Sequence, residues 1–247
     1  MLLNVGLLQD KLLDLIDYFL PHLCPGCGKK VNRKEPFCAE CRLSLRYITP
    51  PFCPICGKPF IIGSFSHVCG DCLENKPFFS ALRAIFVYND PIKKAIIQFK
   101  FQHNTALAPF FIKEILLHLK DFIESIKPDL ILSVPLHIKR LRERGFNQSS
   151  LLAKGLAKAI NVPYKQKILK KNKHTLPQVG LSLNERKKNV RGSFIIRKPE
   201  YIEYIKEKSI LLLDDVCTTG STVNECAKVL IKAGAKAVWV ITLARTV

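Results

Sequence analysis

The stretch from Ile210 to Thr222 restricts the possible folds of this chain more than any other. It begins with four apolar residues, continues with Asp214 and Asp215, and ends in small hydroxyl residues around Gly220. Four consecutive apolar residues are typical of a strand that is buried on both faces, as in parallel sheets. The sequence therefore predicts an α/β fold in which a buried strand leads through an acidic pair into a polar loop.

A helix is predicted directly after this loop. Thr222 and Glu225 fit a capping box at its start, and Gly234 is placed to end it. Free backbone N–H groups at a helix N-terminus form an anion site, and phosphate is its usual ligand. Adjacent carboxylates repel each other unless a cation or ligand hydroxyls offset the repulsion. The pattern favours a ligand that carries phosphate, hydroxyls and magnesium; the alternative is a purely structural strand end with a capped helix.

The same stretch resembles the signature of type I phosphoribosyltransferases, which bind phosphoribosyl pyrophosphate (PRPP). The resemblance implies that Asp214 and Asp215 face the ribose hydroxyls of PRPP, which binds together with Mg²⁺. It also implies that the 5′-phosphate is held by Thr218, Thr219, Gly220, Ser221 and Thr222. A P-loop does not compete with this interpretation, because the sequence contains no Gly-x-x-x-x-Gly-Lys-Ser/Thr run.

Eight cysteines near the start of the chain have the spacing of zinc ligands. They form four pairs, and the two residues between the members of a pair allow both sulfurs to reach one metal ion. The predicted ligands are Cys24, Cys27, Cys38, Cys41, Cys53, Cys56, Cys69 and Cys72. Disulfides would need an oxidising compartment, and the sequence shows no export signal. Because a closed four-sulfur site is structural, we expect no catalysis in this module.

The spacing of the pairs leaves their grouping open. The gaps between successive pairs are 10, 11 and 12 residues, which permits a sequential or a cross-braced arrangement with one or two zinc ions. The block repeats with a period near 29 residues, which favours one zinc per block. His67, two residues before Cys69, is an alternative ligand, although an exposed loop position is favoured for it.

The formal net charge of +19 is unevenly distributed. Residues 1–76 hold 9 Lys and Arg against 7 Asp and Glu, whereas residues 77–247 hold 30 against 13 and carry +17. A basic face of this size predicts polyanions or phosphorylated small molecules as partners of the C-terminal part.

The first residues are Leu-rich but also contain Asp10, Lys11, Asp14 and Asp17. We expect an amphipathic helix over residues 1–22, ended by Pro21, that packs against the rest of the chain. Docking on a membrane surface is an alternative that its acidic residues disfavour. No apolar run approaches the length of a membrane span. These features predict a cytoplasmic protein, with peripheral attachment to a membrane as an alternative.

Lys76 and Pro77 mark the expected boundary between a double CxxC zinc-finger module over 23–76 and a phosphoribosyltransferase-like domain over 77–247. In the latter, strands are expected at 81–88, 130–134, 194–197, 210–213 and 236–243, and helices at 91–101, 106–126 and 147–160. Lys100 is either an anion contact or, as is slightly favoured, part of a solvated helix face.

A basic segment follows the expected strand 130–134. Ligands of open α/β sheets bind outside the carboxyl ends of the strands, and four cations within residues 139–144 suit a diphosphate there. The candidate pyrophosphate contacts are Pro135, Leu136, His137, Arg140 and Arg144. A solvated basic face is the alternative. Residues 165–191 form a long irregular basic stretch, which is typical of a functional or disordered loop.

Several motifs occur in an order that resembles the ComF competence family, of the ComFC type. They are the cysteine pairs, Pro135–His137, Arg144–Gln148, Thr175–Gln178, Arg186–Asn189, the signature, and the terminal run Leu243–Arg245. The resemblance covers nearly the whole chain. It implies a type I phosphoribosyltransferase-like parallel sheet flanked by helices, with a small N-terminal cysteine-rich zinc-finger module.

The resemblance also implies roles. Residues 135–144 would be the pyrophosphate loop, and residues 170–191 a mobile loop that closes over the reacting centre and excludes water. The candidate catalytic residues are Asp214, Asp215 and Arg186, and Cys217 is expected to be a small filler residue. Members of the family resemble proteins that handle single-stranded DNA during natural transformation at the inner face of the inner membrane. Competence proteins such as a DNA helicase or the inner-membrane channel are then expected partners.

The first functional hypothesis is accordingly a PRPP-binding competence protein that contacts single-stranded DNA. Cations would track phosphates while rings such as Phe99, Phe101 and Phe146 stack on bases. The candidate DNA contacts are Lys139, Arg142, Lys171, Lys187 and Lys188. The alternatives are a metabolic phosphoribosyltransferase with an unidentified nitrogenous acceptor, and a catalytically inactive DNA-binding adaptor. An amidophosphoribosyltransferase is disfavoured, since its glutaminase uses an N-terminal cysteine nucleophile and the cysteines here are spaced for metal.

Overall fold

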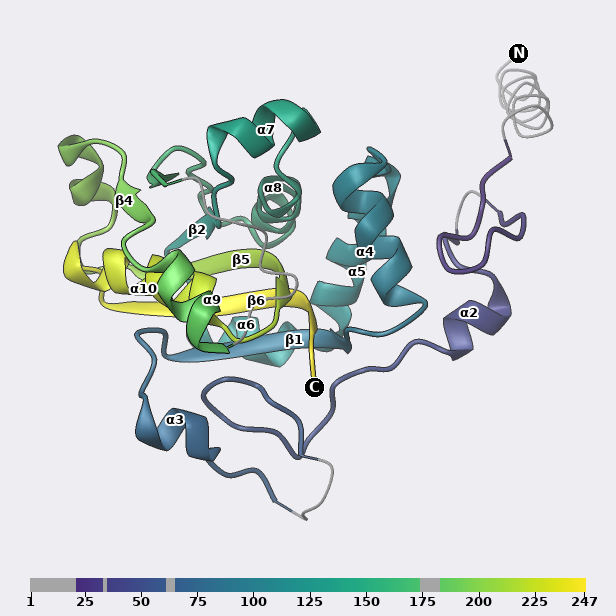
Figure 1. The fold of residues 1–247 in the computed structure, drawn as a ribbon, viewed down its shortest axis with the longest axis horizontal. Helices are drawn as coiled ribbons and strands as arrows, with labels where there is room; N and C mark the ends of the chain where they lie inside the picture. The colour runs from purple at the N-terminus through teal and green to yellow at the C-terminus, as the bar shows by residue number, and fades with distance from the viewer. Residues whose placement is uncertain (1–20, 33–34, 61–64, 174–182) are drawn as a thin grey trace.

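A four-stranded parallel sheet lies at the centre of the C-terminal part of the chain (Figure 1). The strand order is β1–β6–β5–β2, and every neighbouring pair is parallel. The strands are β1 (Ala81–Val87), β2 (Leu130–Ser133), β5 (Ser209–Cys217) and β6 (Ala237–Arg245). Residues 210–213 of β5 are completely or almost completely buried, which explains their uninterrupted apolar character. The predicted α/β fold with a buried signature strand is confirmed.

The computed structural model of the protein describes residues 21–32, 35–60, 65–173 and 183–247, without the side chains of residues 183, 184, 186 and 187. The helix expected over 1–22 therefore lies almost entirely outside the described residues. So does the expected Thr175–Gln178 motif. Within the described part of the chain, no helix is both long and apolar enough to cross a membrane.

Helices cover both faces of the sheet, and alternate residues of β5 pack against different layers. Leu211 and Leu213 belong to the buried cluster that contains the apolar residues of α4, α5 and α8. Ile210 and Leu212 belong to a second cluster, which contains those of α10. The four helices are α4 (Ile92–Phe101), α5 (Ala108–His118), α8 (Gln148–Ile160) and α10 (Ser221–Lys232).

Three segments differ from expectation. The helix expected over 106–126 is η1 (Thr105–Leu107), α5 and α6 (Lys120–Ile126), because Leu119 leaves the helical conformation at φ −121° and ψ 19°. The expected basic loop is largely a helix, α7 (Ile138–Arg144), because its Lys, Arg, Leu and Glu residues are good helix formers.

The stretch over 165–191 is likewise not wholly irregular. It contains β3 (Leu169–Lys171) and α9 (Leu183–Val190). β3 pairs antiparallel with β4 (Phe194–Ile196), and η2 (Pro199–Tyr204) follows. The buried side chains of Leu169 and Phe194 supply the apolar contact that this small sheet needs.

The two cysteine blocks pack against different layers of the structure. The first cysteine block (residues 22–43, with the short helix α2, Ala39–Leu43) contributes Cys24 and Phe37 to the cluster of α4 and α5. The second cysteine block (residues 52–74, with α3, Gly70–Glu74) places its four cysteines in the cluster of α10. Figure 1 shows α2 and α3 well apart from each other.

The second cysteine block is attached to the edge strand β1 by a close backbone contact. Leu82 donates its N–H to the carbonyl of Ile55 at 2.7 Å. Gly57 has φ +68°, and a Cβ at this position would lie 2.6 Å from the Leu82 carbonyl oxygen. Gly28 holds the same place in the first block with φ +79°, and a Cβ there would meet no atom within 4 Å.

This pair of glycines allows a matched stability test. We expect Gly28→Ala to lower the free energy of unfolding by about 1 kcal/mol, because alanine is strained at positive φ. Gly57→Ala should cost about 2–4 kcal/mol, because its Cβ also collides with the β1 backbone. Urea unfolding of the zinc-loaded protein measures both effects. Equal midpoints for the two variants would contradict the close docking of the second block.

Candidate functional site

The acidic pair Asp214–Asp215 lies inside the last part of β5, among polar side chains from three helices. Asp215 is buried, and its Oδ1 forms an ion pair with Lys100 Nζ of α4 at 2.5 Å. Its Oδ2 accepts a hydrogen bond from Gln148 Nε2 at the start of α8. Asp214 Oδ1 accepts from Ser149 Oγ at 3.1 Å and from the Asp215 N–H at 2.9 Å. The two carboxylates are thus held in place by α4 and α8.

Two cationic side chains, Lys100 and Arg144, lie close to the two carboxylates of this pair. Burial raises the pKa of Asp214 well above its usual range, the charge of Asp215 adds to this effect, and Lys100 opposes it. Arg144 of α7 contributes a further cation, with its guanidinium 3.3 Å from Gln148 Oε1 and 4.3 Å from the centre of the Phe101 ring. A ligand that binds here can exchange its own charges and hydroxyls for these internal partners.

Lys100 is the main site residue that the sequence alone does not reveal. The expectation slightly favoured a solvated face, whereas its side chain is only 18% exposed and pairs with Asp215. Gln148 and Ser149 were also not assigned a role. Asn147 places both of them, since its Oδ1 caps α8 at Ser149 N and its Nδ2 donates to the Val134 carbonyl beyond β2. The Asn147–Gln148 dipeptide of the Arg-Gly-Phe-Asn-Gln motif is the only local signal for this arrangement.

The predicted phosphate-binding residues 218–222 connect β5 to α10. Gly220 has φ +76°, a conformation that glycine adopts without strain, and α10 begins at Ser221. Thr219 Oγ1 and Ser221 Oγ are 2.7 Å apart, and a small cavity of about 20 Å³ lies between this loop and Asp214. We refer to residues 218–222 as the phosphate loop.

The predicted capping box is wrong. Gly220, not Thr222, is the N-cap of α10, and it makes no side-chain cap. Glu225 instead accepts the N–H of Gly192 at 2.8 Å, which ties the turn after α9 to α10. The left-handed glycine starts the helix two residues earlier than the Thr-x-x-Glu pattern indicates.

The predicted pyrophosphate contacts lie along the same edge of the sheet as the acidic pair. Val134 donates its N–H to the Leu213 carbonyl at 2.9 Å, so residues 135–137 leave β2 next to the acidic end of β5. His137 Nδ1 accepts the Lys139 N–H at 3.3 Å and caps α7. Arg140 and Arg144 follow one turn apart on α7, and both are half-buried. The structure therefore brings this segment and the phosphate loop to one edge.

The candidate DNA contacts are placed unequally. Lys139, Arg142 and Lys188 are exposed, whereas Lys171 is half-buried with its Nζ 5.5 Å from the centre of the Phe194 ring. Burial lowers the pKa of Lys171, and the Asp214 charge opposes that effect, so Lys171 belongs to the surroundings of the acidic pair. Arg186, the third candidate catalytic residue, and Lys187 lie on α9, but their side chains are outside the described part of the structure.

Of the three rings proposed to stack on bases, only one is well exposed. Phe99 is completely buried and packs on Phe111, because it belongs to the apolar face of α4. Phe146 is half-buried and contacts Phe99 and His103. Phe101 is 60% exposed and carries Arg144 over its ring. Phe99 is therefore a core residue, and Phe101 is the accessible ring next to the acidic pair.

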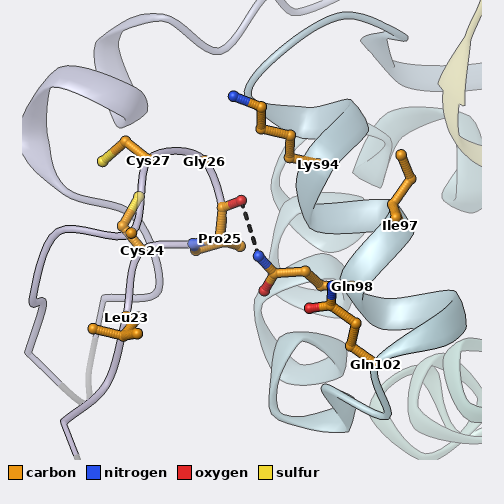
Figure 2. A pocket seen from close by; sticks show the side chains of 10 residues that line it. Leu23, Cys24, Pro25, Gly26, Cys27, Lys94, Ile97, Gln98 and Gln102 are labelled. Atoms are coloured by element: carbon orange, nitrogen blue, oxygen red, sulfur yellow. Dashed lines mark hydrogen bonds between the residues drawn. The ribbon is translucent and has the colours of Figure 1, made fainter.

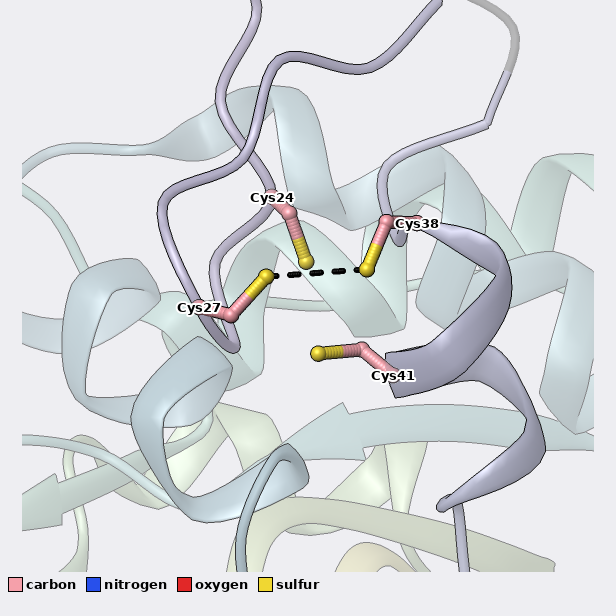
Figure 3. A group of neighbouring side chains, drawn as sticks. All are labelled: Cys24, Cys27, Cys38 and Cys41. Carbon is pink, nitrogen blue, oxygen red and sulfur yellow. Dashed lines mark hydrogen bonds between the residues drawn. The ribbon is translucent and has the colours of Figure 1, made fainter.

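The eight cysteines form two groups of four, one in each block. In each group the sulfur atoms all lie within 4.8 Å of one another (Figure 3 shows the first group). The Sγ atoms of Cys27 and Cys38 are 3.5 Å apart, and those of Cys56 and Cys69 are 3.7 Å apart. Tetrahedral zinc with bonds of about 2.3 Å places its sulfurs about 3.8 Å apart, so both groups fit structural zinc.

The grouping is sequential, as the internal repeat favoured. Burial and the neighbouring sulfurs raise the pKa values of Cys41 and Cys72, and a bound cation would offset this by stabilising the thiolates. His67 is exposed and stacks on the Phe60 ring at 4.0 Å between centroids, outside the group of four sulfurs. It is therefore a loop residue, in agreement with the favoured expectation.

A second, larger cavity of about 400 Å³ lies between the first cysteine block and α4 (Figure 2). Gln98 Nε2 bridges the two elements by donating to the Pro25 carbonyl at 3.2 Å. The cavity is lined by the Leu23–Gly28 turn and by Lys94, Ile97, Gln98 and Gln102. It therefore lies on a different side of α4 from the residues that contact the acidic pair.

Comparison with known proteins agrees with both parts of the structure. Residues 15–73 match the double zinc ribbon domain family, and residues 145–246 match the phosphoribosyl transferase domain family. Competence protein F of Haemophilus influenzae is 32% identical over 228 residues, which cover 90% of each chain. DNA utilization protein YhgH of Escherichia coli K12 is 34% identical over 232 residues, covering 92% of this chain and 98% of that protein.

Competence protein ComFC of Bacillus subtilis is 28% identical over 214 residues, covering 81% of this chain and 80% of that protein. The similarity therefore extends over both cysteine blocks and the sheet, as the order of the motifs indicated.

The sequential grouping of the cysteines can be tested with one variant. In Cys27→Ser/Cys38→Ser, the first site loses two ligands and the second keeps all four. We expect zinc content to fall from two ions per chain to one, and the cobalt-substituted variant to keep a tetrathiolate absorption spectrum. A cross-braced pairing would remove one sulfur from each site, and no tetrathiolate spectrum would remain.

Proposed function

The chain belongs to the family of competence protein F, ComFC and YhgH, and from this membership we propose that it binds PRPP and acts on single-stranded DNA in natural transformation. The observation that carries the first part is the convergence of three groups at one edge of the sheet. These are the acidic pair of β5, the phosphate loop, and the basic residues of α7. Their order along this edge matches the chemical groups of PRPP.

Each part of PRPP has a chemically suited partner in this arrangement. The ribose hydroxyls can donate to the carboxylates of Asp214 and Asp215, and the 5′-phosphate can accept N–H groups of the phosphate loop at the N-terminus of α10. The diphosphate would face Arg140 and Arg144, whose guanidinium groups match phosphate oxygens. Magnesium, which prefers carboxylate and phosphate oxygens, fits the same edge and would neutralise part of the diphosphate charge.

The Lys100–Asp215 pair explains why the ligand must bring both hydroxyls and positive charge. Removing one partner of a buried ion pair costs about 3–5 kcal/mol, because it leaves an uncompensated charge in a poorly solvated place. A ligand that displaces Lys100 from Asp215 must therefore replace its charge and hydrogen bonds. The combination of ribose hydroxyls and a divalent cation does so, whereas free phosphate does not.

The DNA part of the proposal is supported by the charge distribution and by the exposed face of α7. Residues 77–247 carry a formal charge of +17, far more than one bound diphosphate requires. Lys139 and Arg142 are exposed on α7, and Phe101 offers an accessible ring beside Arg144. A single strand that follows α7 would pass next to the PRPP edge. The proposal puts the protein at the inner face of the inner membrane, beside a DNA helicase or a channel protein.

The PRPP assignment is tested by calorimetric titration with PRPP and Mg²⁺. Asp214→Asn/Asp215→Asn should weaken binding at least tenfold, because amides neither hold magnesium well nor accept as strongly from hydroxyls. Asp129→Asn is the matched control, since Asp129 accepts a backbone N–H at the opposite end of β5. Unchanged PRPP affinity in the double variant would show that the acidic pair does not contribute to PRPP binding. Pyrophosphate release with nitrogenous acceptors then distinguishes an active transferase from a binding protein.

The DNA assignment predicts a specific change in salt dependence. Each phosphate contact to a single strand contributes about 0.7 to the slope of log affinity against log salt. Lys139→Gln/Arg142→Gln should therefore lower that slope by about 1.4, with weaker binding at low salt.

The matched control for this DNA test is Lys208→Gln/Lys236→Gln, which removes the same charge from exposed residues that precede β5 and β6. Equal slopes for the two variants would contradict a DNA path along α7, and salt-independent affinity would contradict DNA binding by the basic face.

A further inference from the structure

Arg245, the last residue of β6, is a buried cation whose hydrogen-bond acceptors are a carbonyl and sulfur atoms. It is only 6% exposed. Its Nη1 donates to the Cys56 carbonyl at 2.9 Å and to Cys217 Sγ at 3.1 Å, while its Nη2 lies 3.8 Å from Cys56 Sγ. A buried guanidinium is costly unless negative charge compensates it. The second cysteine block, which contacts the guanidinium through Cys56, can supply that charge.

A zinc ion in the second block would create this charge. Four thiolates around one Zn²⁺ carry a net charge of −2, and Cys56 is one of the four. The guanidinium of Arg245 then lies against a negative cluster. Without the metal, no ion holds the four sulfurs together, and the cluster against which Arg245 lies is lost.

The other side of Arg245 faces the start of the phosphate loop. Cys217 is the last residue of β5 and pairs in register with Arg245. The neighbouring Thr246 donates its N–H to the Cys217 carbonyl at 3.0 Å and its hydroxyl to the Thr218 carbonyl at 3.4 Å. The end of β6 thus holds the first residues of the loop and contacts the second cysteine block at the same time.

We propose that Arg245 is a positioning residue that makes the shape of the phosphate loop depend on the metal in the second cysteine block. The role in ligand binding rests on the proposed PRPP function, whereas the contact itself does not. The first cysteine block has a different environment, because its cysteines pack against α4 and α5. The two zinc sites, alike in sequence, therefore have different functions: the second one supports the ligand site, and the first one does not.

Arg83 provides a matched control for Arg245. It also reaches the second cysteine block, where its Nη1 donates to the Pro54 carbonyl at 2.9 Å and its guanidinium lies over the Phe52 ring. Outside this block it contacts the Leu82 carbonyl and the Phe122 ring. Arg83→Met therefore removes a cation that docks the same block without touching Cys217. An effect shared by both variants would reflect docking of the block alone.

The test compares four variants, each prepared with zinc in the sites that it retains, by hydrogen exchange at the amides of residues 217–222. Arg245→Met and Cys69→Ser/Cys72→Ser should accelerate exchange there at least tenfold, while Arg83→Met and Cys27→Ser/Cys38→Ser change it less than threefold. Exchange in β2 and at residues 210–213 of β5 serves as the check of folding. Equal acceleration by loss of either zinc site, or none by loss of the second, would overturn the proposal.

PRPP binding by the variants and by the parent protein separates this inference from the proposed function. The variants that loosen the loop should also bind PRPP with Mg²⁺ at least tenfold more weakly. If the parent protein does not bind PRPP, the proposed function fails, and the exchange rates still decide the coupling.

If Arg245→Met does not fold, a variant that keeps Arg245 tests the coupling in the reverse direction. This variant carries Cys27→Ser/Cys38→Ser and has cobalt bound in the second cysteine block. PRPP should then shift its thiolate absorption band, because coupling between sites is mutual. An unchanged band at saturating PRPP would overturn the coupling.

Discussion

The ion pair between Lys100 and Asp215 is the interaction on which the architecture of the site depends. Two adjacent carboxylates at the end of a buried strand repel each other and lose solvation, so they persist only where other elements supply compensation. That requirement explains why α4 and α8 meet at this edge. α4 brings Lys100, and α8 brings Gln148 and Ser149. The parallel sheet makes the meeting possible, because α4 follows β1, α8 comes after β2, and the carboxyl ends of the parallel strands all lie at the same edge as the end of β5.

Features with a short period or a fixed spacing could be predicted from the sequence, and features that depend on distant partners could not. The buried strand β5 and the sequential cysteine groups follow from local patterns of apolar residues and sulfurs. Lys100 could not be assigned, because its position on α4 does not indicate which carboxylate it meets after folding. The capping box was misjudged for a related reason: Glu225 accepts from Gly192, a residue that only the tertiary structure brings close.

The two cysteine blocks show how similar sequences acquire different roles through their surroundings. Both blocks have the same Cys-x-x-Cys-Gly-Lys turn and the same left-handed glycine. The first is partly exposed beside α4, while the second is buried against β1 and α10 and contacts Arg245. The internal repeat predicts two equivalent metal sites, but the packing makes the second one part of the support of the phosphate loop. In the sequence, the terminal Leu-Ala-Arg run is explained only by family resemblance. The proposed role of Arg245 gives this run a physical function.

The most direct test of this account is a crystal structure of the protein with PRPP and Mg²⁺ bound. The account predicts the 5′-phosphate on the amides of residues 218–222, the ribose hydroxyls on Asp214 and Asp215, and Lys100 displaced from Asp215. It would be contradicted by PRPP bound elsewhere, such as the cavity between the first cysteine block and α4, with the Lys100–Asp215 pair intact.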